Sequence, residues 1–244
     1  MNKNVNPFVY QRILENDMPN STIPAWIGET YTQCYEDVII DSLIRGHIRR
    51  LGRPLNGMTF IEIGANHPVC TNSTYLWKRK YGISGILVEA NPKLIPNLQK
   101  FRNNDTIINA AVYDQDQDNI DFFISPENEI SSLNEHFVNS WKNLGVQEKI
   151  SVSTIRVNTL FEMVKNIETV ILIIDVEGMD LRILKDINFK KYRPLIIEIE
   201  PSDWLAPGTS TAMIEFMKTK NYEIIGETDV NLIFLDKLTF KATK

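Results

Sequence analysis

The sequence holds two short apolar runs that each include an acidic residue and then break. The first run reads Phe60-Ile61-Glu62-Ile63-Gly64-Ala65-Asn66, and the second reads Gly85-Ile86-Leu87-Val88-Glu89-Ala90-Asn91-Pro92. Short, nearly continuous apolar runs are typical of strands that are buried on both faces of a parallel sheet. Gly64 predicts a sharp turn after the first strand, and Glu89 lies at the carboxyl end of the second. The pattern predicts the cofactor half of a doubly wound α/β domain.

The loops after these two strands indicate the class of ligand. In doubly wound folds, ligands bind outside the carboxyl ends of the strands, and an acidic residue at the end of the second strand binds a ribose diol. Glu89 is predicted to take this role. The first loop has one glycine where a dinucleotide fingerprint has three, so a ligand without a pyrophosphate fits it better. S-adenosylmethionine has a ribose and an adenine but no phosphate, and we therefore expect it in preference to NAD.

Composition narrows the class of protein and its partners. The 244 residues are 43% hydrophobic and 23% charged, which is ordinary for a globular protein. A net charge of −5 and the lack of a prominent Lys/Arg block argue against a nucleic-acid partner. Cys34 and Cys70 are too few for a disulfide framework or a metal-ligand set. With neither a signal-peptide pattern nor an apolar run of membrane-spanning length, we expect a cytoplasmic protein without a membrane span.

The chain divides into an N-terminal part and one large domain. Residues 1–50 are predicted to form an irregular arm, with a short helix around Val9–Leu14 and an amphipathic helix over Glu36–Arg50. Residues 51–244 are predicted to form the α/β domain. An arm of this kind is suited to packing against a second subunit in a homodimer, but the sequence does not give the oligomeric state.

Strands and helices are predicted to alternate through the large domain. The strands are expected at Met58–Ile63, Ile86–Glu89, Thr106–Asn109, Ile120–Ile124, Ile150–Val157, Val170–Ile174, Pro194–Ile199, Tyr222–Gly226 and Asn231–Leu235. The helices are expected at Ser73–Tyr81, Pro92–Phe101, Thr159–Lys165 with Asn158 as its cap, Asp180–Ile187 and Thr211–Lys220. Such alternation predicts a mostly parallel sheet, and the last two strands predict an antiparallel edge.

Residues 125–149 are polar, irregular and long for a connection inside a compact domain. Segments of this length are usually functional lids or disordered stretches. We predict a lid over the active site, and a plain surface insertion is the alternative. Phe137 and Trp141 within it are suited to stacking on a sugar ring, or to ordinary packing.

The candidate cofactor residues follow the first three strands. Gly64 lets the backbone approach a ligand closely. Glu62 is predicted to accept hydrogen bonds from the cofactor's ammonium group, with Asn66 beside it. Asn91 is expected near the adenine, and Ala111 completes the predicted cofactor set together with Glu89 and Asp175.

The candidate catalytic residues are Asp175 and Glu177, which follow another central strand. Two carboxylates there can act as a general base, as a pair of metal ligands or as groups that orient the substrate. The structural alternative is capping of the next helix. His67 is a further candidate base, and Glu200 is expected either in the pocket or at an exposed edge. No residue is assigned to a metal, and the role of a divalent metal is left open.

Several segments match one family when they are taken in order. The most specific segment reads Ile173-Ile174-Asp175-Val176-Glu177-Gly178-Met179-Asp180-Leu181, and Tyr192-Arg193-Pro194-Leu195-Ile196-Ile197-Glu198-Ile199-Glu200 follows it. The two runs described first belong to the same set, as does Thr32-Gln33-Cys34-Tyr35-Glu36-Asp37. Together, these segments resemble the FkbM-type methyltransferase family. The resemblance extends from about Tyr31 to Leu235. The chain departs from the family pattern in having no lysine before Asp175.

The resemblance implies a Rossmann-like, class I methyltransferase fold and S-adenosylmethionine-dependent methyl transfer, most often to a hydroxyl. It implies cofactor roles for Glu62, Gly64, Asn66 and Glu89. Together with the residues, it predicts O-methylation of a hydroxyl on a saccharide or another small secondary-metabolite-type acceptor, with Asp175 as the first choice of base. One alternative is an N-methyltransferase acting on an amide or peptide side chain. A non-catalytic binding module is the other, and a dinucleotide-dependent oxidoreductase is disfavoured by the single glycine.

Overall fold

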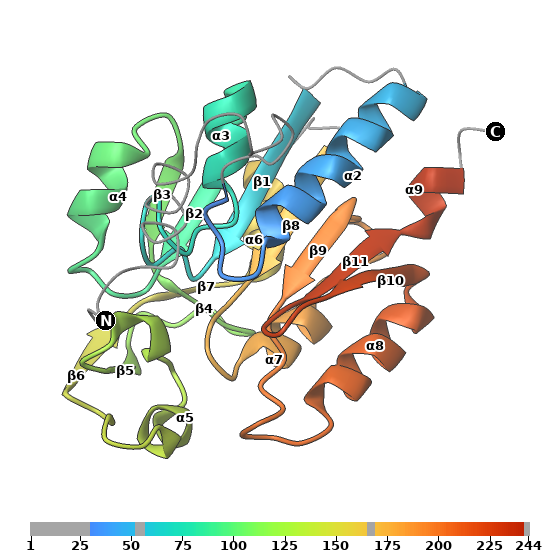
Figure 1. Cartoon of the computed structure of the whole chain (residues 1–244). Helices are drawn as coiled ribbons and strands as arrows, with labels where there is room; N and C mark the ends of the chain where they lie inside the picture. The colour runs from blue at the N-terminus through green and yellow to red at the C-terminus, as the bar shows by residue number, and fades with distance from the viewer. Residues whose placement is uncertain (1–29, 52–56, 165–168, 242–244) are drawn as a thin grey trace, which may run out of the picture.

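A seven-stranded sheet with helices on both faces forms the centre of the molecule (Figure 1). The computed structural model describes residues 30–51, 57–164 and 169–241. The strands of the sheet are β1 (Met58–Ile63), β2 (Ile86–Glu89), β3 (Thr106–Asn109), β8 (Thr169–Ile174), β9 (Ile196–Ile199), β10 (Tyr222–Glu227) and β11 (Leu232–Asp236). The helices are α2 (Glu36–Leu51), α3 (Tyr75–Tyr81), α4 (Ile95–Phe101), α6 (Val157–Met163), α7 (Asp180–Asp186), α8 (Thr209–Thr219) and α9 (Lys237–Lys241).

The strand order confirms the predicted α/β class. The sheet runs β10-β11-β9-β8-β1-β2-β3, and β1 pairs in parallel with both β8 and β2. The antiparallel strand is β11, which lies between β10 and β9 and opposes both. A short turn, closed by a hydrogen bond from the Thr228 N–H to the Asn231 carbonyl, joins β10 to β11. Because β11 returns alongside β9, β10 forms the edge and runs in the same direction as the parallel strands.

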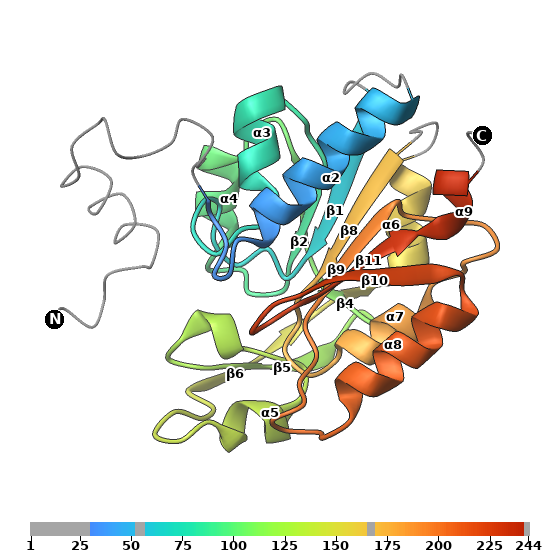
Figure 2. The same cartoon turned by 45° about the vertical axis from the view of Figure 1, so that its right-hand side comes forward.

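Alternation along β1 builds a core on each face of the sheet. Ile61 and Ile63 pack into one cluster, which includes buried residues of α6, α7 and α8. Phe60 packs into the opposite cluster with residues of α2, α3 and α4. Figure 2 shows the two sets of helices on opposite sides of the sheet. Both faces are therefore covered, as a doubly wound parallel sheet requires.

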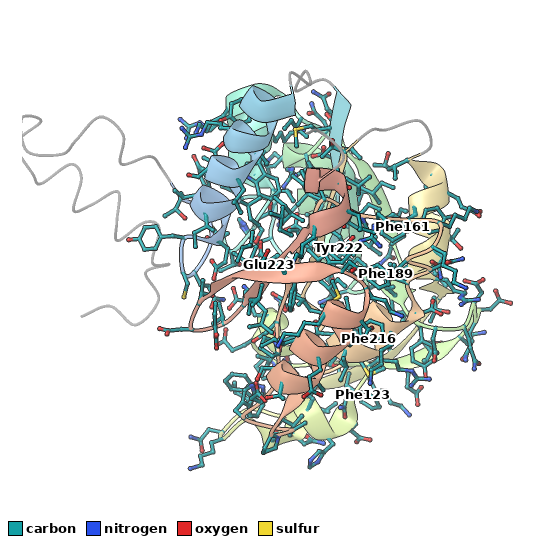
Figure 3. The ribbon with its side chains drawn as sticks, turned by 90° about the vertical axis from the view of Figure 1, so that its right-hand side faces the viewer. Phe123, Phe161, Phe189, Phe216, Tyr222 and Glu223 are labelled. Carbon is teal, nitrogen blue, oxygen red and sulfur yellow. The ribbon has the colours of Figure 1, made fainter. Side chains whose placement is uncertain are left out.

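An aromatic cluster secures the β10 edge of the sheet. Phe189 makes edge-to-face contacts with Phe216 and Tyr222, at centroid distances of 6.1 and 5.5 Å. The Tyr222 hydroxyl donates a hydrogen bond to the Pro194 carbonyl at 2.6 Å. These rings lie together on the side of the sheet that α8 covers (Figure 3). Their packing holds β10 at the edge of the sheet.

A smaller layer lies beyond the carboxyl ends of the central strands (Figures 1 and 2). It consists of β4 (Ala111–Val112), β5 (Ile120–Ile124), the 3-10 helix η2 (Asn128–Ile130), α5 (Glu135–Ser140), β6 (Glu148–Val152) and β7 (Thr154–Ile155). Most of residues 125–149 belong to this layer and are more regular than the sequence indicated. Asn134 caps α5 by accepting a hydrogen bond from the Phe137 N–H.

Several predicted boundaries are wrong. Helix α4 begins at Ile95 rather than Pro92, because a turn from Asn91 to Leu94 precedes it. The strand predicted over Ile150–Val157 is divided into β6 and β7, and its last residue starts α6. Asn158 therefore lies inside α6 and does not cap it. Its side-chain amide instead donates a hydrogen bond to the Asp186 carbonyl at 2.8 Å.

Of the two helices predicted in the N-terminal part, one lies within the described residues. The amphipathic helix is confirmed as α2, with Ile40 and Ile44 fully buried. The short helix predicted around Val9–Leu14 lies outside the described residues. The boundary between residues 1–50 and 51–244 stays a prediction.

Candidate active site

Two adjoining cavities lie at the carboxyl ends of the central strands. The first, called here the apolar cavity, is a space of about 550 Å³ that includes open solvent. Its apolar wall includes Val88, Ala111, Val112, Phe122, Leu133 and Met179. The second, called here the acidic cavity, is a space of about 990 Å³ that also includes open solvent. Its carboxylate residues are Glu36, Glu62, Glu129, Asp175, Glu177, Glu198 and Glu200.

The two cavities share part of their walls. Gly64 and Asn66 from the loop after β1 line both of them, as do Asp175 and Glu177 from the loop after β8. Glu129 from η2 also belongs to both walls. Because β1 and β8 are parallel neighbours, their following loops emerge side by side. The arrangement brings most of the predicted site residues to the boundary between the cavities.

Gly64 permits the close approach of these two loops. Its φ is 88°, in the region that favours glycine. A Cβ at this position would lie 1.7 Å from the backbone oxygen of Asp175, which is much shorter than any non-bonded contact. The Gly64 N–H also donates a hydrogen bond to the Val88 carbonyl at 3.0 Å. A side chain is therefore excluded here, and the backbone itself forms the floor of both cavities.

Glu89 connects the loops that follow β1 and β2. One carboxylate oxygen accepts a hydrogen bond from the Asn66 N–H at 2.8 Å, and the other accepts one from the Asn91 N–H at 2.6 Å. Burial raises the pKa of Glu89, and these two hydrogen bonds oppose the rise. Each carboxylate oxygen can accept a further hydrogen bond. Glu89 thus lines the apolar cavity and can accept further hydrogen bonds there.

Ala111 and Asn91 have different positions relative to this cavity. Ala111 lies in β4 and belongs to the cavity wall. Asn91 is buried behind Glu89, where its side-chain amide donates a hydrogen bond to Asn128 at 3.2 Å. It lies in neither wall. The structure therefore gives Asn91 contacts that hold the loop in place.

Glu62 faces the acidic cavity from β1. One carboxylate oxygen accepts a hydrogen bond from the Ser73 N–H at 3.2 Å, and the other accepts one from the Thr74 hydroxyl at 2.6 Å. Burial raises the pKa of Glu62 to about 7, although the Arg102 guanidinium and these hydrogen bonds oppose the rise. Both oxygens already have a donor within the protein.

The loop after β8 is held in a tight conformation. Glu177 and Gly178 have φ values of 59° and 90°. The Asp180 carboxylate accepts hydrogen bonds from the Val176 and Gly178 N–H groups, both at 3.0 Å. The Ser132 hydroxyl donates to the Glu177 carbonyl at 2.7 Å and ties residues 125–149 to this loop. The backbone is thereby fixed while the Asp175 and Glu177 side chains stay directed into the cavities.

Three carboxylates converge on this loop. Asp175, Glu177 and Glu200 each place one oxygen so that the three atoms lie within 4.8 Å of one another. Although the Asp175 side chain is exposed, desolvation by the surrounding protein raises its pKa to about 6, and a hydrogen bond with Glu200 opposes the rise. Desolvation and the nearby Asp175 raise the pKa of Glu177 and that of Glu200. Such shifts are frequent at functional sites, because neighbouring carboxylates cannot all ionise easily.

His67 is not brought to either cavity wall. Its side chain is exposed, and its Nδ1 accepts hydrogen bonds from the Val69 and Cys70 N–H groups at 3.2 and 2.9 Å. Partial burial lowers the pKa of His67. The histidine that the sequence offered as a base therefore stabilises its own loop.

A buried arginine that sequence reasoning missed supports the first loop. Arg102, which follows α4, donates hydrogen bonds to the Asn72 side chain at 2.7 Å and to the Thr74 hydroxyl at 2.8 Å. Its Nε donates to Asp105 at 2.7 Å, and neither side chain of this ion pair is exposed. Nothing in the local sequence distinguishes Arg102 from a solvated residue at a helix end.

Aromatic side chains lie at the rim of the acidic cavity. Trp141 lines the cavity and makes an edge-to-face contact with Trp204 at 4.8 Å. Phe137 packs against Trp204 at 5.1 Å and is fully buried. The two tryptophans are 37% and 50% exposed, so their rings remain available to a ligand. Trp204, in the loop after β9, was not among the predicted residues.

The mostly parallel seven-stranded sheet with helices on both faces is Rossmann-like, of the class I methyltransferase type. The family model of the methyltransferase FkbM domain matches residues 62–224, which is more than half of the chain. The chain belongs to the FkbM methyltransferase family and is an S-adenosylmethionine-dependent methyltransferase. The family resemblance stated from the sequence is thereby confirmed.

Solved structures with a similar fold include methyltransferases. The precorrin-6y C5,15-methyltransferase from Geobacter metallireducens GS-15 is 14% identical, over 72% of this chain and 77% of that chain, with a TM-score of 0.37. A chain of the fibrillarin/Nop5p complex is 11% identical, over 87% and 89%, with a TM-score of 0.41. These likenesses are distant and add nothing about the acceptor. A search of curated protein sequences found no match.

Among residues 30–51, 57–164 and 169–241, no helix has the length and apolar character that crossing a membrane requires.

Proposed function

We propose that this methyltransferase transfers a methyl group to a hydroxyl of a small acceptor, with a saccharide as the favoured class. The observation that carries the proposal is the wall shared by the apolar and acidic cavities. A cofactor in one cavity and an acceptor in the other would meet at Asp175 and Glu177. A methyltransferase needs this juxtaposition, because the two reacting atoms must be held in a near-attack arrangement.

The apolar cavity suits S-adenosylmethionine. Ala111, Phe122 and Leu133 offer apolar surface to an adenine, and Glu89 offers carboxylate oxygens to a ribose diol. Gly64 would let the remainder of the ligand pass over bare backbone toward the acidic cavity. When bound, this cofactor supplies a methyl group on a positively charged sulfur. The carboxylates at the shared wall would favour that charge.

The acidic cavity suits the acceptor. Trp141 lines it with a partly exposed ring, against which Trp204 packs, and such rings pack well against the apolar face of a sugar. Carboxylates along its wall offer acceptors for sugar hydroxyls. Asp175 lies at the boundary between the cavities and is the proposed general base, with Glu177 beside it. Its pKa of about 6 matches the usual requirement for a base that works near neutral pH.

The first experiment measures methyl transfer and cofactor binding separately. The wild-type chain is incubated with S-adenosylmethionine and a panel of methyl glycosides and amines, and release of S-adenosylhomocysteine is followed. We expect turnover with at least one hydroxyl acceptor. Asp175→Asn should lower turnover by about 10²–10⁴-fold, the usual contribution of general-base catalysis, while S-adenosylmethionine still binds.

The matched control is Asp118→Asn, which makes the same chemical change at an exposed position. It should leave turnover unchanged. Equal turnover of wild type and Asp175→Asn would contradict the assignment of the base. Turnover confined to amines would favour the N-methyltransferase alternative. Binding of neither S-adenosylmethionine nor any acceptor would favour the binding-module alternative.

A further inference from the structure

The acidic cavity contains more carboxylates than a neutral hydroxyl acceptor needs as hydrogen-bond partners. Seven carboxylate residues line it, and among the described lining residues none is Lys, Arg or His. Carboxylates in such proximity repel one another when they ionise, and burial adds a desolvation cost. A bound cation would offset both effects.

Three of these carboxylates have the geometry of a metal site. The contributing oxygens of Asp175, Glu177 and Glu200 lie within 4.8 Å of one another. Divalent Mg²⁺ and Ca²⁺ bind carboxylate oxygens at about 2.0–2.6 Å, so oxygens around one ion lie up to about 4–5 Å apart. The three residues come from the loops after β8 and β9, which are adjacent parallel strands. The fold therefore brings the three oxygens together without any further movement of the chain.

An independent observation comes from Glu198. This side chain is only 2% exposed and lines the same cavity. Its Oε1 accepts a hydrogen bond from the Ser73 hydroxyl at 2.7 Å, whereas its Oε2 has no hydrogen-bond partner among the described residues. Glu198 and Glu200 are two positions apart on one extended segment, so their side chains leave on the same side. A buried acceptor without a donor is costly, and a cation or its bound water would satisfy it.

We propose that Asp175, Glu177 and Glu200 bind a divalent cation, with Glu198 accepting a hydrogen bond from water bound to it. The inference rests on the proposed function, because the cation would lie in the acceptor cavity and orient the acceptor hydroxyl beside Asp175. If each residue bound the cation through one oxygen, the second oxygen of Asp175 would be left to take the proton of that hydroxyl. The all-oxygen ligand set favours Mg²⁺, Mn²⁺ or Ca²⁺ over softer metals.

The test is a titration of the chelator-treated full chain with Mn²⁺, in which the electron paramagnetic resonance signal reports the free ion. Neither S-adenosylmethionine nor an acceptor is present. We expect a single saturable class of sites from which Mg²⁺ displaces Mn²⁺. Glu200→Gln should weaken Mn²⁺ binding by at least about tenfold, as losses around metal sites do. Glu215→Gln, at an exposed position on α8, should bind Mn²⁺ as the wild type does.

Two outcomes would overturn the proposal. The first is the absence of Mn²⁺ binding by the folded wild-type chain, and the second is equal Mn²⁺ affinity of wild type and Glu200→Gln. Methylammonium is titrated in parallel by calorimetry, and its binding in place of Mn²⁺ would assign the cavity to an organic cation instead. Circular dichroism confirms that each variant is folded. Because the titration contains no cofactor, its result is independent of whether methyl transfer to a hydroxyl is found.

Discussion

At the scale of single residues, the same carboxylate chemistry serves different purposes according to its partners. Glu89 accepts two backbone N–H groups and faces the apolar cavity, whereas Glu62 has a donor on each oxygen. The sequence predicted both as cofactor residues because each belongs to an apolar run that is followed by a turn. A sequence pattern does not show which carboxylate oxygens already accept a hydrogen bond within the folded protein. Glu62 is accordingly better placed to hold the loop after β1, and its contact with a cofactor stays a prediction.

The burial of Glu62 predicts an unusual dependence of stability on pH. Its pKa rises from 4.5 to about 7 in the folded chain, so the unfolded chain loses this proton first as the pH rises. The contribution of Glu62 to the free energy of unfolding should therefore fall between about pH 4.5 and pH 7. Relative to Glu62→Gln, the wild type should lose about 3 kcal/mol over this window. Denaturant unfolding at several pH values measures the difference, and a constant difference would contradict the prediction.

At the scale of elements, helix α4 positions the site through the residue that follows it. Arg102 lies between the rings of Phe60 and Tyr75 and donates hydrogen bonds to Asn72 and Thr74. Thr74 in turn donates to Glu62. The end of α4 is thereby connected to the loop that carries Gly64 and Asn66, although α4 itself lies outside both cavities.

The variant Arg102→Met should test this connection. It would remove the closer of two ion pairs of Asp105, since Lys78 stays at 3.0 Å, together with the hydrogen bonds to Asn72 and Thr74. Breaking a buried pair costs about 3–5 kcal/mol. For a chain of this size, we expect the unfolding midpoint to fall by at least about 6 °C. Lys100→Met, an exposed change within α4, is the matched control and should leave the midpoint nearly unchanged. An equal midpoint for both variants would show that Arg102 does not hold the loop.

At the scale of the whole molecule, the sheet was predictable and the surroundings of the site were less so. Strands β1 and β2 begin and end where apolar runs and turn residues predicted, because burial on both faces leaves a strong local signal. Helix α4 and the β6–β7 region were misplaced, because turns set by hydrogen bonds determine their starts. Glu129, Arg102 and Trp204 reach the site only through tertiary packing, which no local pattern records.

The cofactor prediction is tested on the whole molecule by thermal unfolding. A ligand at 100 times its dissociation constant stabilises the folded chain by about 2.7 kcal/mol, because it binds only that state. S-adenosylmethionine and S-adenosylhomocysteine should therefore raise the midpoint by about 5–10 °C, and NAD should not. Glu89→Gln should reduce this rise at fixed ligand concentration, whereas the exposed Glu227→Gln should not. A full rise with Glu89→Gln would remove Glu89 from the cofactor site, and a rise with NAD alone would show that one glycine in the first loop does not exclude a dinucleotide.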